Sequence, residues 1–336
     1  MDLSTTYLGL ALKNPFVPSS SPLSKRVDRA RQLEDAGAAA IVMYSLFEEA
    51  IEADDRLAAQ LANQQDIGHA EASSYLPMHL DYPGRRDEYL EQLRRLKSTL
   101  GIPVIASLNG TTRGGWVRHA EAIQEAGADA LELNIYFIAA DFAEEPASVE
   151  QRVIDILAET VSQVTLPVGV KLSPYYSALG HLVTRIEATG ASGVALFNRF
   201  YQPDIDTDSL DVSQVMHLSS SKDALLAMRW MALLHGRVGL SLAATGGVHT
   251  AADALKMLLC GADVTYLCST LLLNGAAQLR HIHDGVVEWM KRNEYTSVQQ
   301  LRGSLSQQHS PDPAAFERGN YLQLLTNYEP PKSVWR

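Results

Sequence analysis

Four polar side chains stand at or near the ends of apolar runs in this sequence, and they are the groups best placed to do chemistry. They are Lys171, Asn134, Asn198 and Asn109. A buried lysine is costly unless an anion accompanies it, and asparagine offers two hydrogen-bond donors and an acceptor. Together they predict a polar floor for a planar ligand with alternating carbonyl and N–H groups that develops negative charge. The structural alternative is that Lys171 simply pairs with Glu132 on the neighbouring strand.

A second polar set follows the last two apolar runs of the chain. Gly246 and Gly247 end one run, and Ser269 and Thr270 end the next. Glycine lets backbone N–H groups approach an anion closely, and α/β barrels often hold a phosphate between their last two loops. A Gly-Gly pair alone is more typical of a plain turn. The two polar ends together leave a phosphate site and a plain turn as open alternatives.

The elements that must position these groups are eight apolar runs that alternate with helical patterns. The predicted strands cover residues 16–18, 39–44, 104–108, 130–134, 168–172, 193–197, 240–243 and 264–267, and helical patterns include 85–100, 115–126, 148–163 and 223–234. The strands are apolar throughout, as expected when both faces of a parallel sheet are buried. We therefore predict an α/β fold, a (β/α)8 TIM barrel. A doubly wound sheet would usually carry Gly-x-Gly-x-x-Gly after its first strand, where this sequence has none.

Two predicted loops are longer than a minimal barrel needs. They cover residues 46–84 after the second strand and 198–222 after the sixth. Both follow strands, so we expect them at the face where barrels build active sites, as lids or binding loops. The second loop contains Asp204, Asp206, Asp208 and Asp211, but it lacks the glycine and terminal glutamate of a calcium loop. A solvated loop is therefore favoured, and no metal site is expected.

Composition limits the class of partner. The formal net charge is −11 at pH 7, which argues against a nucleic-acid surface or an anionic membrane surface. The longest apolar stretch is broken by Arg229 and Arg237, so no membrane span is predicted. The N-terminus shows no signal-peptide pattern. The two cysteines, Cys260 and Cys268, form no disulfide framework. We expect a cytoplasmic protein.

Five motifs occur along the chain in an order and spacing that can be compared with known families. They are Asn14-Pro15-Phe16 with Ser19-Ser20, Glu132-Leu133-Asn134, Pro167-Val168-Gly169-Val170-Lys171-Leu172-Ser173-Pro174-Tyr175, Ala244-Thr245-Gly246-Gly247-Val248 and Leu258-Leu259-Cys260-Gly261-Ala262. In order and spacing the chain resembles the dihydroorotate dehydrogenase family, the FMN-dependent barrels of pyrimidine biosynthesis, and above all its soluble class 1 branch. The resemblance implies an FMN-binding barrel over residues 1–302 and a C-terminal extension over 303–336.

The resemblance also implies roles for single residues. It assigns FMN contacts to Ser20, Ser45, Asn134, Lys171, Phe197 and Ser219, and the phosphate to Gly246, Gly247, Ser269 and Thr270. It assigns substrate contacts to Tyr44, Asn134, Asn198 and Arg199. The implied substrate is a small molecule such as a dihydropyrimidine. The soluble members also imply a homodimer.

The departures from the family pattern concern the substrate. A cysteine or serine base removes a proton from dihydroorotate in the family, and Phe137 stands at that position. Tyr44 replaces a lysine, and Met78 replaces an asparagine. Tyr136 and Tyr44 are the nearest substitute bases, but an unperturbed tyrosine has a pKa of about 10. The groups that hold flavin are mostly kept, while those that grip and deprotonate dihydroorotate are depleted.

Three functions follow from this pattern. The first is an FMN oxidoreductase that acts on dihydroorotate or a related ring with a substitute base. The second is an FMN oxidoreductase with a different substrate or redox partner, which needs no base. The third is a non-catalytic FMN-binding regulator or complex subunit.

Overall fold

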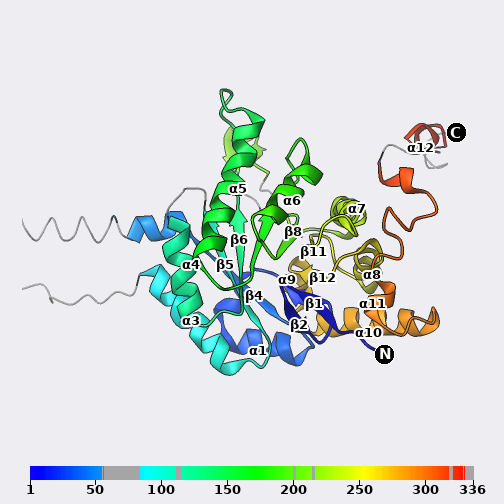
Figure 1. Ribbon diagram of the computed structural model, residues 1–336, viewed down its shortest axis with the longest axis horizontal. Helices are drawn as coiled ribbons and strands as arrows, with labels where there is room; N and C mark the ends of the chain where they lie inside the picture. Colours follow the sequence, from blue (N-terminus) through cyan, green and yellow to red (C-terminus); the bar gives the residue numbers. More distant parts are fainter. Residues whose placement is uncertain are drawn as a thin grey trace, which may run out of the picture.

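The computed structural model describes residues 1–54, 56, 84–110, 115–199, 202–213, 216–317, 321–327 and 329 (Figure 1). The predicted substitution at Met78 and most of the loop 46–84 lie outside these residues.

Eight parallel strands form the centre of the fold. They are β3 (Phe16–Pro18), β4 (Ile41–Phe47), β5 (Val104–Gly110), β6 (Ala130–Ile135), β7 (Val168–Leu172), β8 (Gly193–Leu196), β11 (Ser241–Thr245) and β12 (Val264–Leu267). Their order in the sheet is β3-β12-β11-β8-β7-β6-β5-β4. The backbone N–H of Ala39, just before β4, donates to the carbonyl of Phe16 in β3 at 3.0 Å. This bond joins the two ends of the sheet, so the fold is a (β/α)8 TIM barrel, as predicted.

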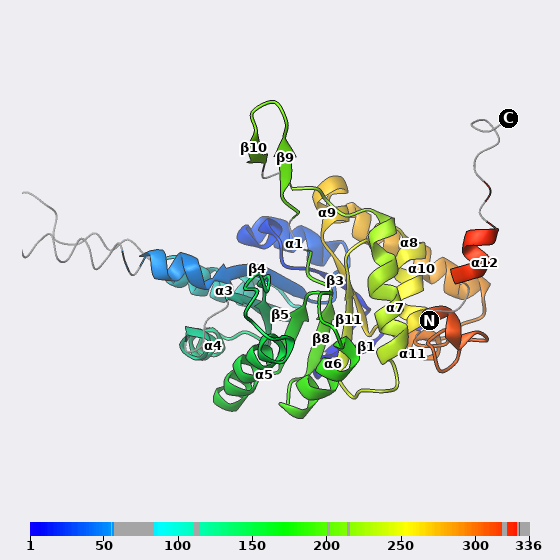
Figure 2. The same ribbon diagram turned by 90° about the horizontal axis from the view of Figure 1, so that it is seen from above.

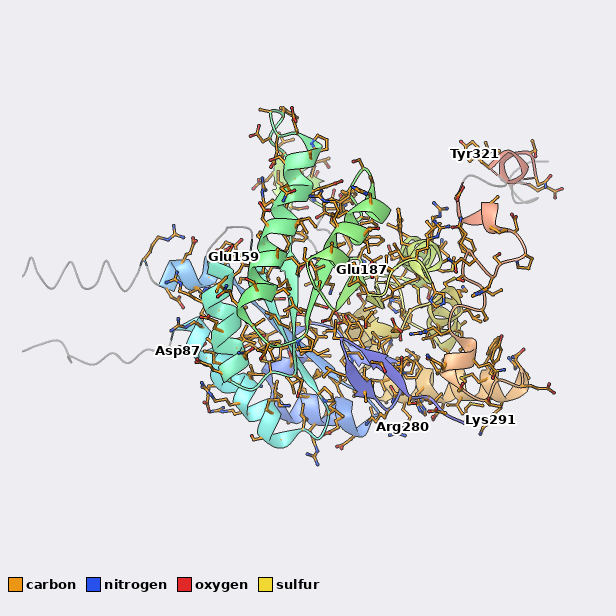
Figure 3. The ribbon with its side chains drawn as sticks, viewed as in Figure 1. Asp87, Glu159, Glu187, Arg280, Lys291 and Tyr321 are labelled. Carbon is orange, nitrogen blue, oxygen red and sulfur yellow. The ribbon has the colours of Figure 1, made fainter. Side chains whose placement is uncertain are left out.

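Helices lie between the barrel strands in the sequence and follow the last of them. They are α1 (Val27–Asp35), α3 (Arg85–Thr99), α4 (Gly115–Glu125), α5 (Pro146–Gln163), α6 (Leu179–Ala188), α7 (Ala224–Leu234), α8 (Ala251–Cys260), α9 (Ser269–Asn274), α10 (Ala277–Arg292), α11 (Val298–Leu301) and α12 (Tyr321–Thr326). Charged side chains such as Asp87, Glu159 and Arg280 lie on the outer side of these helices (Figure 3). Among the described residues no helix is long and apolar enough to cross a membrane.

The apolar core has two layers, because successive side chains of a strand point to opposite faces. Leu131 and Leu133 of β6 pack outward against the helices. Ala130 of the same strand packs inward with Tyr7 and Leu8. These two residues belong to an N-terminal hairpin of β1 (Thr5–Tyr7) and β2 (Leu10–Leu12), which closes the amino-terminal end of the barrel.

The hairpin fits because one layer of the barrel lacks bulky side chains. Gly169 and Gly193 are register partners on β7 and β8, and Leu8 fills the space beside them. A Cβ added at Gly193 would lie 2.7 Å from Leu8 Cδ2 and 2.8 Å from the carbonyl oxygen of Ser241. Glycine is therefore required here by a close approach between the hairpin and the barrel wall.

Gly193→Ala is expected to lower the free energy of unfolding by ~1–3 kcal/mol, the usual cost of overpacking a core. The matched control is Gly180→Ala in α6, where the nearest neighbour of a new Cβ, Trp230, is 4.0 Å away. This helical glycine should gain about 0.5–1 kcal/mol on substitution. Urea unfolding of both variants measures the two changes in stability, and equal changes would contradict the close approach of the hairpin to Gly193.

The predicted strands are confirmed, with small shifts at their ends. Those at residues 16–18, 168–172 and 264–267 match β3, β7 and β12. β4 begins at Ile41 rather than residue 39, because Ala39 already bonds to β3. The loop after the sixth barrel strand forms an unpredicted hairpin, β9 (Asp204–Asp206) and β10 (Asp211–Ser213), which projects from the barrel (Figure 2). Its aspartates are exposed, as expected for a solvated loop.

The first residues beyond 302 pack against the barrel. The backbone N–H groups of Gly303 and Leu305 donate to the carbonyls of Leu258 and Leu259, and Gln307 donates to Ala232. Ser306 and Gln307 are buried. The start of the C-terminal extension is thus joined to α7 and α8, and the division at residue 302 stays a prediction.

Candidate active site

The predicted polar floor forms at the carboxyl end of the barrel. Asn109, Asn134 and Lys171 are register neighbours on β5, β6 and β7, so their side chains share the interior face. They are 7%, 8% and 7% exposed. Parallel pairing therefore brings together three polar groups that lie far apart in the sequence.

Lys171 has few partners for a buried ammonium group. Its Nζ donates to Ser19 Oγ at 3.3 Å and lies 3.9 Å from Glu132 Oε1. It also lies 5.7 Å from the ring centre of Tyr266. The ion pair with Glu132 is the structural alternative noted from the sequence, but it is long and leaves donor capacity for a ligand.

Asn134 and Asn198 meet directly. The Nδ2 of Asn198 donates to Oδ1 of Asn134 at 2.8 Å. Each amide is held by the other, so the remaining donor and acceptor groups have fixed directions. The pair can therefore present hydrogen-bonding groups to one face of a planar ring.

A chain of hydroxyl groups crosses the site from β3 to β5. Ser20 Oγ lies 3.2 Å from Ser45 Oγ, which lies 2.8 Å from Ser107 Oγ. Tyr89 of α3 fixes the far end of this chain, because its hydroxyl donates to the carbonyl of Ser107 and accepts from the backbone N–H of Ser107. Ser20 and Ser45 are thus brought together, as their shared predicted role requires.

The predicted phosphate residues also gather at one place. Ser269 Oγ accepts from the backbone N–H of Ser219 at 3.1 Å, and Ser219 Oγ accepts from Gly247 at 3.4 Å. Ser219 Oγ is also 3.2 Å from Nε2 of His249. Thr270 Oγ1 donates to the carbonyl of His249 at 3.4 Å. Two loops and the segment before α7 converge here.

Phe137 points toward an apolar hollow. Its ring lies 4.5 Å below the guanidinium of Arg152, which an ion pair holds to Glu144. With Tyr175 and Tyr176, among other residues, Phe137 lines a hollow of ≈ 360 Å³. The position where the resemblance places a base therefore carries an apolar ring beneath a cation.

Other predicted residues are less well joined to this floor. Tyr44 packs edge-on against Tyr89, 5.1 Å between ring centres, and lies near Lys25. Phe197 is buried after β8, and its N–H donates to Thr245 at 3.4 Å. Arg199 is exposed. The contacts described for Tyr44 and Arg199 do not include the Asn134–Asn198 pair, and the substrate roles of both residues stay predictions.

A protein-family model described as dihydroorotate dehydrogenase matches residues 65–290. The chain belongs to the dihydroorotate dehydrogenase family.

Relatives within this family cover nearly the whole chain. The catalytic subunit of dihydroorotate dehydrogenase B (NAD(+)) from Thermoplasma acidophilum is 27% identical over 306 residues, which is 90% of this chain and 98% of that protein. The same subunit from Pyrococcus abyssi is 25% identical over 310 residues, covering 90% and 98%. The NAD-dependent dihydropyrimidine dehydrogenase subunit PreA from Escherichia coli is 24% identical over 324 residues, covering 90% and 76%.

FMN is the cofactor of dihydroorotate dehydrogenases, and the residues of this chain fit it. Gly246 has φ +91, and a Cβ built there would meet nothing within 4 Å, so the space beside it is open. Ser219 and Ser269 border this loop and are buried. A phosphate would be held here by hydroxyl and backbone N–H donors, and Lys171 would face the ring.

The residues at the carboxyl end of the barrel could bind and orient this cofactor. When bound, FMN would supply the acceptor for a hydride removed from a substrate. Lys171 would supply positive charge, and the Asn134–Asn198 pair would offer hydrogen-bonding groups to a planar ring. Ser20, Ser45 and Ser107 hold each other, so their oxygens are fixed before a ligand arrives.

Two further residues contact the predicted site, although no cofactor-binding role was predicted for either. His249 contacts Ser219 and Thr270, and Ser107 joins the hydroxyl chain. His249 follows the Gly-Gly pair, which was a usable signal. Ser107 lies inside an apolar run, and its role depends on which strands are neighbours.

Proposed function

We propose that this chain is an FMN-dependent oxidoreductase of the dihydroorotate dehydrogenase family whose substrate or redox partner is not dihydroorotate. The supporting observation is the phenyl ring of Phe137, which lies beneath Arg152 and beside an apolar hollow, at the position to which the family resemblance assigns the base. A phenyl ring can neither accept nor donate a proton. An oxidation that needs no base at this position is therefore favoured.

One of the two substitute bases, Tyr44, is weakened by its surroundings. Burial, together with the charge of Glu88, raises the pKa of Tyr44 above its ordinary value. Tyr44 is therefore largely protonated near neutral pH, and a protonated group cannot act as a general base.

The named relatives suggest which donors to test. Two are catalytic subunits of NAD(+)-linked dihydroorotate dehydrogenases, and one is a subunit of an NAD-dependent dihydropyrimidine dehydrogenase. We propose either a small planar substrate or an electron-transfer partner for this chain. We also propose, from the family resemblance, a homodimer in the cytoplasm. A flavin-binding protein without turnover is the alternative.

An anaerobic bleaching screen tests this function. The purified holoprotein is mixed with dihydroorotate, dihydrouracil, dihydrothymine, NADH and NADPH, and FMN absorbance is followed. We expect at least one donor other than dihydroorotate to reduce FMN at a rate that saturates with its concentration. Fast reduction by dihydroorotate would refute the proposal, and reduction by none of the donors would favour the non-catalytic alternative.

A further inference from the structure

Glu132 is a buried carboxylate whose only ion pair among the described residues is with Lys171. It is 1% exposed and lies on the interior face of β6, one layer below Asn134. Within the described residues neither of its oxygens accepts a hydrogen bond of standard geometry, although the Tyr266 hydroxyl lies close enough to interact with the carboxylate. A buried charge without hydrogen bonds is costly, and an apolar residue would fill this place more cheaply. The carboxylate therefore needs an explanation.

Three tyrosine hydroxyls share the interior with Glu132. Tyr7 and Tyr266 hydroxyls lie 2.9 Å apart, and the Tyr89 hydroxyl bonds to the backbone of Ser107. Burial raises the pKa of each tyrosine, and the negative charge of Glu132 raises it further. The negative charge of Glu132 thus acts on all three tyrosines, and their neutral hydroxyl groups do not neutralise it.

Lys171 is the cation that can cancel it. The ion pair joins Nζ to Oε1 at 3.9 Å, with exposed side-chain fractions of 8% and 1%. Ser19 Oγ, 3.3 Å from Nζ, fixes the ammonium from another side. In a buried pair the two charges interact strongly, because little water screens them. Glu132 therefore influences both the position and the effective charge of Lys171.

Glu132 lies too deep to face the cofactor itself. Its register neighbours are Ser107 and Gly169, one layer below the Asn109, Asn134 and Lys171 layer. Leu8 of the N-terminal hairpin lies against Gly169 in the same region. The carboxylate is thus enclosed by the barrel, and Lys171 stands between it and the open end of the site.

We propose that Glu132 is a positioning residue that, through Lys171, sets how strongly the site prefers reduced over oxidised FMN. The proposal rests on FMN as the cofactor. Reduced FMN carries more negative charge than oxidised FMN, so the ammonium of Lys171 favours the reduced form. Glu132 offsets part of this charge. Its neutralisation therefore strengthens the preference for reduced FMN and raises the reduction potential.

Glu132→Gln tests this inference, because glutamine keeps the shape and removes the charge. The dissociation constants of oxidised and reduced FMN are measured anaerobically, together with the reduction potential. We expect their ratio to shift toward the reduced form by about tenfold or more, which corresponds to a potential about 30 mV higher for a two-electron couple. Glu132→Asp keeps the charge and should remain closer to the wild type. An unchanged or lower potential in Glu132→Gln overturns the proposal.

A double-mutant cycle with Lys171→Met separates an effect through Lys171 from a general effect of charge. In the Lys171→Met background, Glu132→Gln should shift the potential by less than a third of its effect in the wild type. An equal shift in both backgrounds overturns the proposal. The double variant also has neither buried charge, so it keeps the test possible if Glu132→Gln alone does not fold.

The matched control is Asp263→Asn. Asp263 is also a buried carboxylate in an ion pair, with Arg302, but it precedes β12 at the opposite end of the barrel. Its neutralisation should leave the potential unchanged, and an equal rise there would overturn the proposal. A wild-type protein that binds no FMN would refute the cofactor itself, a failure that is visible before any variant is made.

Discussion

Anaerobic mixing with dihydroorotate is expected to bleach the bound FMN at least about 10²-fold more slowly than in the Thermoplasma acidophilum relative under the same conditions. General base catalysis is typically worth ~10²–10⁴-fold, and Phe137 cannot supply it. Stopped-flow absorbance with saturating dihydroorotate measures both rates. A rate within tenfold of that of the relative would mean that another group takes the proton.

Restoring a base at this position should recover little of the rate. In Phe137→Cys the thiol would take the place of a ring that lies beneath Arg152 and beside Tyr175 and Tyr176. The groups expected to bind the substrate differ as well. Tyr44 stands where the family resemblance implies a lysine, and its ring packs against Tyr89. We expect less than a tenfold gain with dihydroorotate. Recovery of the full rate would show that Phe137 alone accounts for the defect.

Tyr136→Phe provides the control for a substitute base. Tyr136 is half-buried and follows β6 directly. Removal of its hydroxyl should leave the slow bleaching rate unchanged if no tyrosine takes the proton. A further fall of tenfold or more would identify Tyr136 as the base, and an FMN oxidoreductase that acts on dihydroorotate or a related ring with a substitute base would then be favoured.

The sequence predicted the barrel because its strands are buried on both faces. Such strands are apolar throughout, and β7 and β12 are bounded by proline or glycine turns that mark where they begin. The two hairpins were not predicted. Their strands are three residues long, and the exposed one alternates aspartate with apolar residues without a buried face. Short strands of this kind leave too little pattern to detect.

The candidate site was predictable in part for the same reason. Lys171 and Asn134 interrupt or end apolar strands, so the cost of their burial marks them in the sequence. Asn198 is marked only by its place at the end of an apolar run. The link from Ser45 to Ser107 and the contact of His249 with Ser219 depend on spatial neighbours. Serine is common and small, so its type alone carries no signal. Strand order had to be known before these residues could be placed.

Gly246→Ala is expected to lower the affinity for FMN at least about tenfold, a loss of roughly 1.4 kcal/mol. A new Cβ at Gly246 would meet no protein atom within 4 Å. The only steric cost inside the protein comes from φ +91, which L residues rarely adopt. A loss of FMN affinity that is absent from a variant with the same kind of backbone strain must therefore come from the ligand that fills this space. Fluorescence titration of the apoprotein with FMN measures the affinity.

Gly9→Ala is the matched control for the backbone cost. Gly9 has φ +75, and a Cβ there would also meet nothing within 4 Å, but it lies in the N-terminal hairpin at the other end of the barrel. Both variants should lose about 1–2 kcal/mol of stability from strain. Only Gly246→Ala should lose FMN. Equal FMN affinities in the two variants would place the phosphate away from the Gly246–Gly247 loop. A colourless wild-type protein that does not bind added FMN would refute FMN as the cofactor.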